Sequence, residues 1–298
     1  MTSLQQTLPS DRLTGRLRAA AGLAPAGPHY FFVRHKAFVR IAHWINAICL
    51  AILLMSGLNI FNAHPALYWG NDSDFRRPLL MLGAYENSSG QVVKGVTQIG
   101  RKEFDTTGLL GASRPEEDLV ARGFPSWATL PGGNWLAMAR LWHFAFAWLL
   151  VINAAGFLIY GVAVGHFRKD ILPSRANLAH LGKELLAHIR LRFPRGEDAK
   201  RYNGLQKLAY SLVIFALGPL IVLSGLAMSP TMDAAFPLLP ALLGGRQSAR
   251  TIHFLCAFSF LAFFIIHIAM VVLSGTWNNL RSMITGWYAI DTSERQHD

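Results

Sequence analysis

The sequence predicts an all-α membrane protein in which four transmembrane helices form a bundle. Of the 298 residues, 52% are hydrophobic and 15% are charged, whereas a soluble domain carries about 25% charged residues. Four apolar runs are each long enough to cross a bilayer, which takes about 20 residues. The basic residues, which give a formal net charge of +11, gather in particular connecting segments, as they do in membrane proteins.

The four apolar runs are the expected membrane spans, at 41–61, 141–164, 208–228 and 251–274. The segment up to Arg40 lacks the apolar core of a signal peptide, and the first run continues too far to be a cleaved signal. Pro219 lies inside the third run, where its missing N–H predicts a kink. The spans form one domain over residues 40–274, flanked by tails over 1–39 and 275–298.

The orientation follows from Lys and Arg, because cytoplasmic loops carry an excess of both. The segment before the first span and the inner loop, 165–207, are strongly basic. The outer loop, 62–134, carries seven basic and eight acidic residues. Both tails are therefore expected in the cytoplasm and the protein in a bacterial inner membrane, in contact with lipid. The net charge is largely this topology signal, so no nucleic-acid partner is expected.

Both long loops exceed the length of a tight turn. The outer loop is expected to hold a hairpin near 86–96, and it is long enough to form a cap or a docking surface. In the inner loop, apolar residues recur at helical spacing beside basic ones over 174–191. This pattern predicts an amphipathic helix, either on the membrane surface or as a solvated loop helix.

Four histidines lie in or at the edge of the spans, where an ionisable side chain is costly and usually functional. They are His43, His143, His253 and His267. The last two share the fourth span 14 residues apart, which is nearly four helical turns, so they face nearly the same way about 21 Å apart. By depth, His143 matches His253 on the outer side and His43 matches His267 on the inner side.

Each histidine pair can clamp one haem iron from its two faces, which makes the expected fold a four-helix bundle with two haems b. Bis-imidazole ligation leaves no open position on the iron, and this suits electron transfer. Three arginines stand three residues before a proposed ligand, on the same helix face; they are Arg40, Arg140 and Arg250. We expect them to reach haem propionates, although arginines at a membrane interface also snorkel to water without such a role.

Other cofactors fit the sequence less well. The two cysteines, Cys49 and Cys256, lie in apolar runs, and no Cys-x-x-Cys-His occurs, which excludes covalent c-type haem and an iron–sulfur cluster of the usual ligation. Two histidine pairs about 20 Å apart do not form the close tetrahedral array of a zinc site. A non-haem transporter with buried histidines stays a lesser alternative.

The sequence resembles the bacterial cytochrome b561 and nickel–iron hydrogenase b-type cytochrome superfamily. The residues that carry the resemblance are Arg40-Ile-Ala-His43-Trp44-Ile45-Asn46, the Leu-Met-Ser-Gly end of the first span, Arg140-Leu-Trp-His143, and the His253 and His267 pair. The resemblance implies haem b ligation by one histidine from each of the first two spans and two from the fourth. It also implies electron exchange with quinone or quinol.

The long outer loop and the stretch 62–70 make the chain more similar to thiosulfate-reductase-type cytochrome b subunits, which partner molybdenum enzymes on the outer side. This implies an electron-transfer subunit of a respiratory chain rather than a complete enzyme, linking the quinone pool to an outer, periplasmic molybdopterin oxidoreductase. The alternative is a stand-alone membrane oxidoreductase that acts on quinone and a small molecule such as superoxide.

Several further residues are candidates for weaker roles. Asn46, Asn153, Tyr160 and His166 are possible quinone contacts near the inner pair. His64, just beyond the first span, is interpreted as a surface histidine, or as a contact for a quinone or a docking partner. Ser-Gly-Leu occurs at 56–58 and again at 224–226, which is too short an echo to establish a repeat.

Overall fold

The computed structural model describes residues 29–115, 117–190 and 202–291. Within these ranges, four helical segments are long and apolar enough to cross a membrane, namely α2 (Ala37–Asn62), α3 (Leu136–Ala163), a composite helix from Gly204 to Ala227, and α9 (Arg246–Leu273). This confirms the four predicted spans. Each begins four or five residues earlier than predicted, because the first turn of each helix is more polar than the rest and is not marked by hydropathy.

The third span is not a regular α-helix. α5 (Gly204–Leu212) passes into a π-helical turn, η4 (Val213–Leu217), and then into α6 (Gly218–Ala227). Pro219 has no N–H to donate to the preceding turn, and a local π adjustment is one way in which a membrane helix accommodates proline. The helix is therefore irregular just before Pro219, where the π-helical turn ends at Leu217, and the kink itself stays a prediction.

The chain forms two compact units. Of the described residues, the first unit contains those of 29–41, 162–190, 202–211 and 265–291, and the second contains those of 42–115, 117–161 and 212–264. Each membrane helix contributes one part to each unit, so the division cuts across the four spans.

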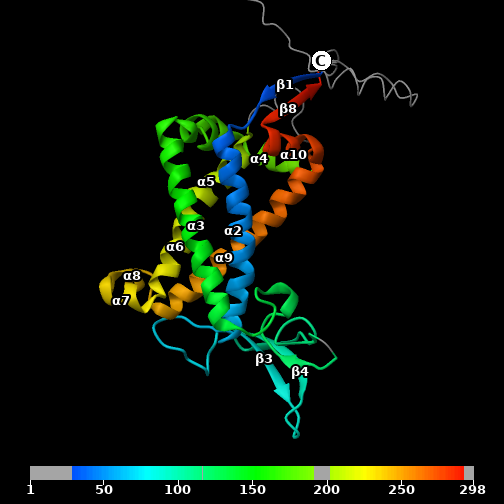
Figure 1. Ribbon diagram of the computed structural model, residues 1–298, viewed down its shortest axis with the longest axis vertical. Coiled ribbons are helices and arrows are strands. Elements are labelled where there is room, and N and C mark those ends of the chain that lie inside the picture. The colour runs from blue at the N-terminus through cyan, green and yellow to red at the C-terminus, as the bar shows by residue number, and fades with distance from the viewer. Residues whose placement is uncertain (1–28, 116, 191–201, 292–298) are drawn as a thin grey trace, which may run out of the picture. The chain divides into compact units, whose positions relative to one another are not determined.

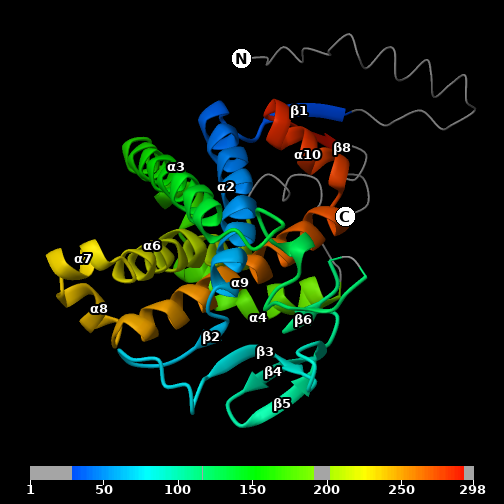
Figure 2. The ribbon, with the colours of Figure 1, turned by 60° about the horizontal axis from the view of Figure 1, so that its bottom comes forward.

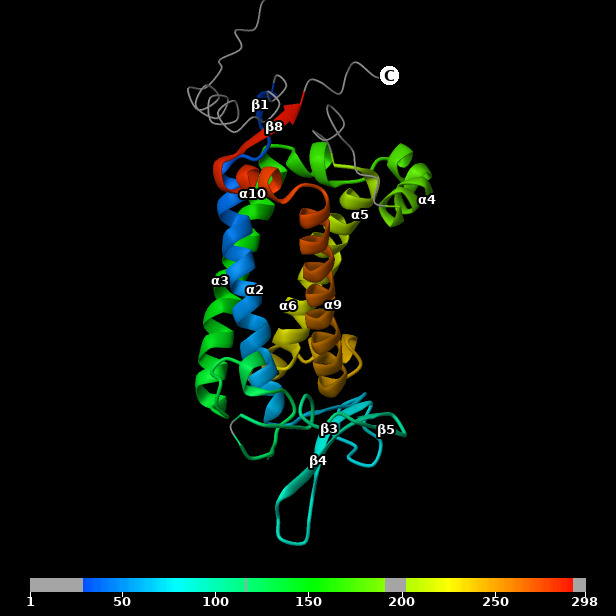
Figure 3. The same cartoon turned by 90° about the vertical axis from the view of Figure 1, so that its right-hand side faces the viewer.

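In the second unit, α2 lies beside α3, and α6 lies beside α9 (Figures 1 and 3). The side-chain amide of Asn153 in α3 donates hydrogen bonds to Oδ1 of Asn46, at 2.7 Å, and to the carbonyl of Ala42, at 2.9 Å. Such amide bonds help to hold transmembrane helices together. Two short helices, α7 (Pro230–Ala235) and α8 (Leu238–Leu242), connect α6 to α9.

Residues 62–134 of the second unit fold into a cap of short strands. β2 (Ala66–Leu67), β3 (Leu80–Glu86), β4 (Val92–Ile99) and β5 (Lys102–Asp105) form an antiparallel sheet in that order, and β6 (Ala112–Ser113) pairs with β7 (Val120–Ala121) (Figure 2). β3 and β4 form a hairpin whose turn covers residues 87–91, which confirms the hairpin predicted near 86–96.

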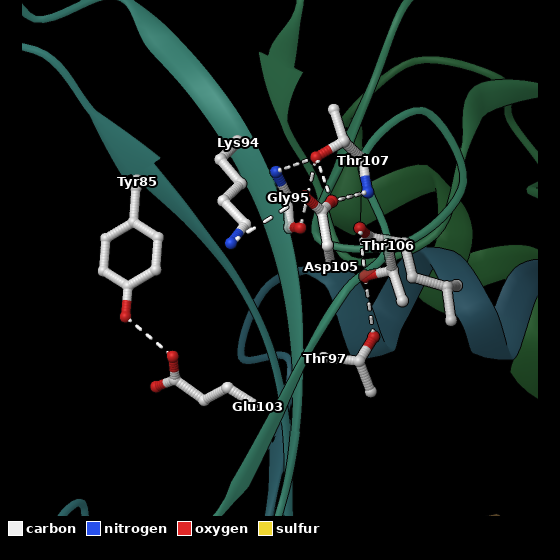
Figure 4. A network of polar contacts seen from close by, with 9 residues as sticks. Tyr85, Lys94, Gly95, Thr97, Glu103, Asp105, Thr106 and Thr107 are labelled. Carbon is white, nitrogen blue, oxygen red and sulfur yellow. Dashed lines mark hydrogen bonds and ion pairs between the residues drawn. The ribbon is translucent and has the colours of Figure 1, made fainter.

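A polar network surrounds β5 (Figure 4). The Thr107 hydroxyl donates to Oδ1 of Asp105 at 2.6 Å, and the Thr107 main-chain N–H donates to the same oxygen at 3.1 Å. Because these bonds favour the ionised carboxylate, they lower the pKa of Asp105 below its usual value. The Tyr85 hydroxyl donates to Glu103 at 3.0 Å, which links β3 to β5.

The cap is anchored to α2 by a side chain at the end of that helix. The Asn62 amide donates to the carbonyl of Phe124 at 3.1 Å, and the Phe124 N–H donates back to Oδ1 of Asn62 at 2.7 Å. The apolar core of the cap is formed by Phe61, Leu67, Leu82 and Phe124. Phe254 and Phe258 of α9 pack against it, so the cap and the helices of the second unit share one core.

The cap is also anchored to the start of α9. The main-chain N–H groups of Gln247 and Ser248 donate to the carbonyl of Gly70, at 3.0 and 3.1 Å. The Gly70 N–H donates in turn to the Ser248 hydroxyl at 2.7 Å. The first N–H groups of a helix lack partners within the helix, so the cap satisfies part of the first turn of α9. Gly245 allows this approach, because a Cβ at that position would lie 2.5 Å from the Gly70 oxygen.

In the first unit, the two predicted tails pair with each other. β1 (His29–Val33) runs antiparallel to β8 (Trp287–Asp291), which follows α10 (Thr276–Thr285) (Figure 3). The Arg281 guanidinium lies over the ring of Phe31, and that of Arg34 lies over Tyr288, at 4.8 and 4.5 Å from the ring centres. The tails are thus partly folded, which hydropathy alone did not predict.

The described part of the inner loop that precedes α5 contains two helical elements, within residues 165–190 of the first unit. A π-helical turn, η2 (Phe167–Ile171), precedes α4 (Arg175–Ile189). α4 confirms the helix predicted over 174–191. Its Glu184 carboxylate accepts a hydrogen bond of 2.8 Å from the Leu205 N–H at the start of α5.

Candidate functional site

The four predicted ligand histidines all lie on membrane helices, and all are half-buried. His43 lies on α2, His143 on α3, and His253 and His267 on α9. α9 is uninterrupted from Arg246 to Leu273, so the 14-residue spacing runs along one continuous α-helix.

The predicted outer pair is brought together within the second unit. The ring centres of His143 and His253 are 6.2 Å apart, and their planes are inclined by 62°. Two metal–nitrogen bonds of about 2 Å, plus about 1 Å from each nitrogen to its ring centre, span about 6 Å. The separation of the two imidazoles therefore fits one metal ion between them.

Hydrogen bonds hold the Nδ1 atoms of both rings. Nδ1 of His143 lies 3.1 Å from the Ser56 hydroxyl, and Nδ1 of His253 lies 3.2 Å from the Ser224 hydroxyl. Nδ1 of His253 also lies 3.0 Å from the carbonyl of Ile221. A carbonyl only accepts hydrogen bonds, so this Nδ1 carries the hydrogen and Nε2 keeps its lone pair for a metal. The donor set fits an iron held through two neutral imidazoles.

Sequence reasoning noted the two Ser-Gly-Leu motifs but did not predict that they support these rings. Ser56 and Gly57 of α2 contact His143, and Ser224 and Gly225 of α6 contact His253. The signal that could have found them is the repeated Ser-Gly-Leu, which occurs near the same end of two different spans.

The predicted inner pair combines residues of the two units. His43 belongs to the second unit and His267 to the first, and their pairing stays a prediction. Of the candidate quinone contacts, Asn46 and Asn153 bond to each other. Nδ1 of His166 lies 2.7 Å from the Asp170 carboxylate.

The three arginines predicted to bind propionates lie in different surroundings. Arg250 donates a hydrogen bond to the carbonyl of His64, and its guanidinium lies 5.4 Å from the ring centre of Phe61. Arg140 is exposed, with its guanidinium 5.7 Å from the ring centre of Phe144. Their role toward propionates stays a prediction.

Arg40, the third of these arginines, packs against the turn at Gly286 in the first unit. A Cβ at Gly286 would lie 2.5 Å from Nη1 of Arg40. Its propionate role likewise stays a prediction.

His64 is half-buried rather than a plain surface histidine. Its ring packs in a triangle with those of Tyr68 and Phe75, whose centres are 5.6 and 5.7 Å from it and 5.8 Å from each other. Burial and the nearby Arg250 guanidinium both disfavour the charged ring, and they lower the pKa of His64 below its usual value. We therefore expect His64 to be neutral at pH 7, as part of the base of the cap.

Two comparisons with known proteins place the chain among membrane cytochromes. Residues 34–286, which include all four predicted ligand histidines, match the prokaryotic cytochrome b561 family. The chain is also 28% identical over 241 residues to a protein of Azospira oryzae described as a putative protein-methionine-sulfoxide reductase subunit YedZ1. That alignment covers 80% of this chain and 90% of the relative.

Proposed function

The chain belongs to the prokaryotic cytochrome b561 family, and from this membership and the geometry of the outer site we propose that it is a dihaem electron-transfer subunit. The family carries b-type haem and transfers electrons in bacterial membranes. In our proposal the chain links the quinone pool to an oxidoreductase on the outer side. Both termini then lie in the cytoplasm.

The facing rings of His143 and His253, 6.2 Å apart, carry the proposal. Both rings are held through Nδ1, so both Nε2 atoms are free to bind one iron. Haem bound there supplies a one-electron couple. His143 and His253 would hold the haem iron through two imidazoles and would leave no position for a small substrate, which favours electron transfer over oxygen chemistry.

The second haem is proposed between His43 and His267. The support is the spacing on α9, where 14 residues of continuous helix place His267 about 21 Å along the axis from His253. A haem at each level divides the thickness of the membrane into two shorter electron-transfer steps. Arg40, Arg140 and Arg250 are the proposed propionate partners.

The proposed partner is an oxidoreductase that docks at the cap. The Azospira relative is described as a subunit of a methionine-sulfoxide reductase, so a sulfoxide-reducing partner fits well. A sulfoxide takes up two electrons and two protons, which yields a thioether and water. A quinol releases two electrons and two protons on oxidation, so the electrons balance. We propose a molybdenum enzyme for this role, because the thiosulfate-reductase-type cytochrome b subunits that the sequence resembles partner such enzymes.

The first test is the haem-to-protein ratio of the detergent-purified chain, with a reduced-minus-oxidised spectrum. The proposal predicts about two haems b with sharp low-spin bands. Purified protein without haem would overturn it and would favour the transporter alternative.

Ligand variants test the pairing. His143→Ala and His253→Ala should each remove one haem and leave the other, and His43→Ala and His267→Ala should remove the opposite one. Equal loss of both haems from all four folded variants would contradict the pairing. Addition of quinol to the wild type in proteoliposomes should reduce both haems.

A further inference from the structure

The two rings of the outer pair are held by the same short motif on two different helices. Ser56 of α2 lies 3.1 Å from Nδ1 of His143, and Ser224 of α6 lies 3.2 Å from Nδ1 of His253. Serine and histidine are 87 residues apart in the first pair and 29 in the second. The shared arrangement is therefore not a consequence of local chain geometry. Each of the two imidazole rings thus packs against a serine that is followed by a glycine.

Each serine has its own hydrogen committed to its helix. The Ser56 hydroxyl donates to the carbonyl of Ile52 at 2.7 Å, and the Ser224 hydroxyl donates to the carbonyl of Ile221 at 3.1 Å. The hydroxyl oxygen is then left to accept from the histidine Nδ1–H. The Ile221 carbonyl near Nδ1 of His253 can only accept a hydrogen bond, so it too requires that this Nδ1 carries the hydrogen and donates.

The glycines leave space for the rings. A Cβ on Gly57 would lie 3.3 Å from Cε1 of His143, and a Cβ on Gly225 would lie 3.2 Å from Cε1 of His253. These distances are shorter than ordinary van der Waals contact between carbon atoms. An alanine at either position would therefore require the ring to shift by a few tenths of an ångström.

The serine hydroxyls are out of reach of water, because Ser56 and Ser224 are both 0% exposed. A buried polar group that loses its partner cannot replace it with solvent and bears the full desolvation cost. Loss of either Ser–His hydrogen bond would therefore be costly, which favours the geometry in which both are formed.

We propose that Ser56-Gly57 and Ser224-Gly225 are positioning residues that orient the two outer haem ligands and set the reduction potential of that haem. The inference rests on the proposed function. A hydrogen bond accepted from Nδ1–H fixes the tautomer and ring angle and makes Nε2 a stronger donor. A stronger donor stabilises the ferric state, so both serines lower the potential of the outer haem.

The competing explanation is purely structural. Serine commonly bonds to its own helix carbonyl, and small residues let membrane helices approach closely. Under that explanation the serines could be replaced by a residue of similar size with no effect on the haem.

The test is a redox titration with low-temperature EPR on the purified haem-loaded protein. The variants are Ser56→Ala, Ser224→Ala, Ser56→Cys and Ser224→Cys. Cysteine keeps the approximate size but is a weak acceptor. The control is Ser259→Ala in α9, whose hydroxyl donates to the carbonyl of Leu255 at 2.8 Å and lies on an exposed face.

We expect each Ala and Cys variant to shift the reduction equilibrium of the outer haem at least about threefold toward the ferrous state, which is about 28 mV at 59 mV per tenfold change. The EPR signal of the same haem should change, and the inner haem and the Ser259 control should not. Gly57→Ala and Gly225→Ala should lower the occupancy of the outer haem. Loss of the outer haem alone from both the Ala and the Cys variants would also support the proposal.

If the reduction potential of the outer haem is unchanged in the Cys variants, the proposal is overturned, whether the Ala variants keep or lose the haem. The size of the serine side chain alone would then account for its presence at both positions. Failure of the proposed function would look different. The wild type itself would then lack the outer haem before any variant is compared.

Discussion

The side-chain amide of Asn153 donates a 2.7 Å hydrogen bond to the side-chain oxygen of Asn46. The same amide donates to the carbonyl of Ala42, the residue before His43. α3 is thus hydrogen-bonded to the turn of α2 that carries His43, a proposed haem ligand. These two asparagines, considered as quinone contacts from the sequence, have a structural role in joining the two helices.

Asn153→Ala should loosen this helix pair. Interhelical hydrogen bonds in membranes contribute about 1 kcal/mol, so we expect a loss of about that size and a lower occupancy of the haem bound by His43. Thermal unfolding in detergent, followed by circular dichroism and by haem absorbance, measures both effects. Ser259→Ala is the control, and equal stability of the two variants would contradict the assigned role of Asn153.

Arg250→Gln should lower the potential of the outer haem. Removal of a nearby cation favours the more positive ferric form, and we expect a shift of about 20–60 mV, where 59 mV is a tenfold change for one electron. A redox titration measures the shift. An unchanged potential, with a cap that becomes more accessible, would show instead that Arg250 acts through its bond to the His64 carbonyl.

Asn62→Ala should detach one edge of the cap from α2, because both hydrogen bonds to the Phe124 main chain are lost. The loss of a buried partner costs about 1–3 kcal/mol. Limited proteolysis should then cut within residues 62–134 faster than in the wild type. Asn87→Ala, which alters only the exposed turn between β3 and β4, should leave cleavage near the core of the cap unchanged.

The stability of the cap should depend on pH through Asp105. Its pKa is lowered in the folded protein, chiefly by the Thr107 hydroxyl. The carboxylate therefore stabilises the cap above the usual pKa of an aspartate, and this contribution is lost as the pH falls through the lower, folded value. Thr107→Val should raise the pKa of Asp105 toward its ordinary value, as followed by NMR of labelled aspartate. Thr97→Val should not, because Thr97 bonds to Thr106.

Much of the membrane architecture could be predicted from the sequence, because its signals are local. A run of about 20 apolar residues predicts a membrane span, and four helices long and apolar enough to be spans are present among the described residues. The 14-residue spacing of His253 and His267 needs only the pitch of one helix, and α9 is continuous over both. Pro219 acts within its own turn, so an irregularity there was predictable.

The tertiary structure alone decided what the local signals could not. The Ser56–His143 bond joins residues 87 apart, and the hydrogen bond between the Gly70 N–H and the Ser248 hydroxyl at the start of α9 joins residues 178 apart. Hydropathy assigns the polar segment 62–134 only to the aqueous side, and the local sequence predicted its β3–β4 hairpin, whereas the packing of Phe61 and Phe124 against α9 could not be predicted from either. Such contacts depend on which helices become neighbours, and only the packed chain contains that information.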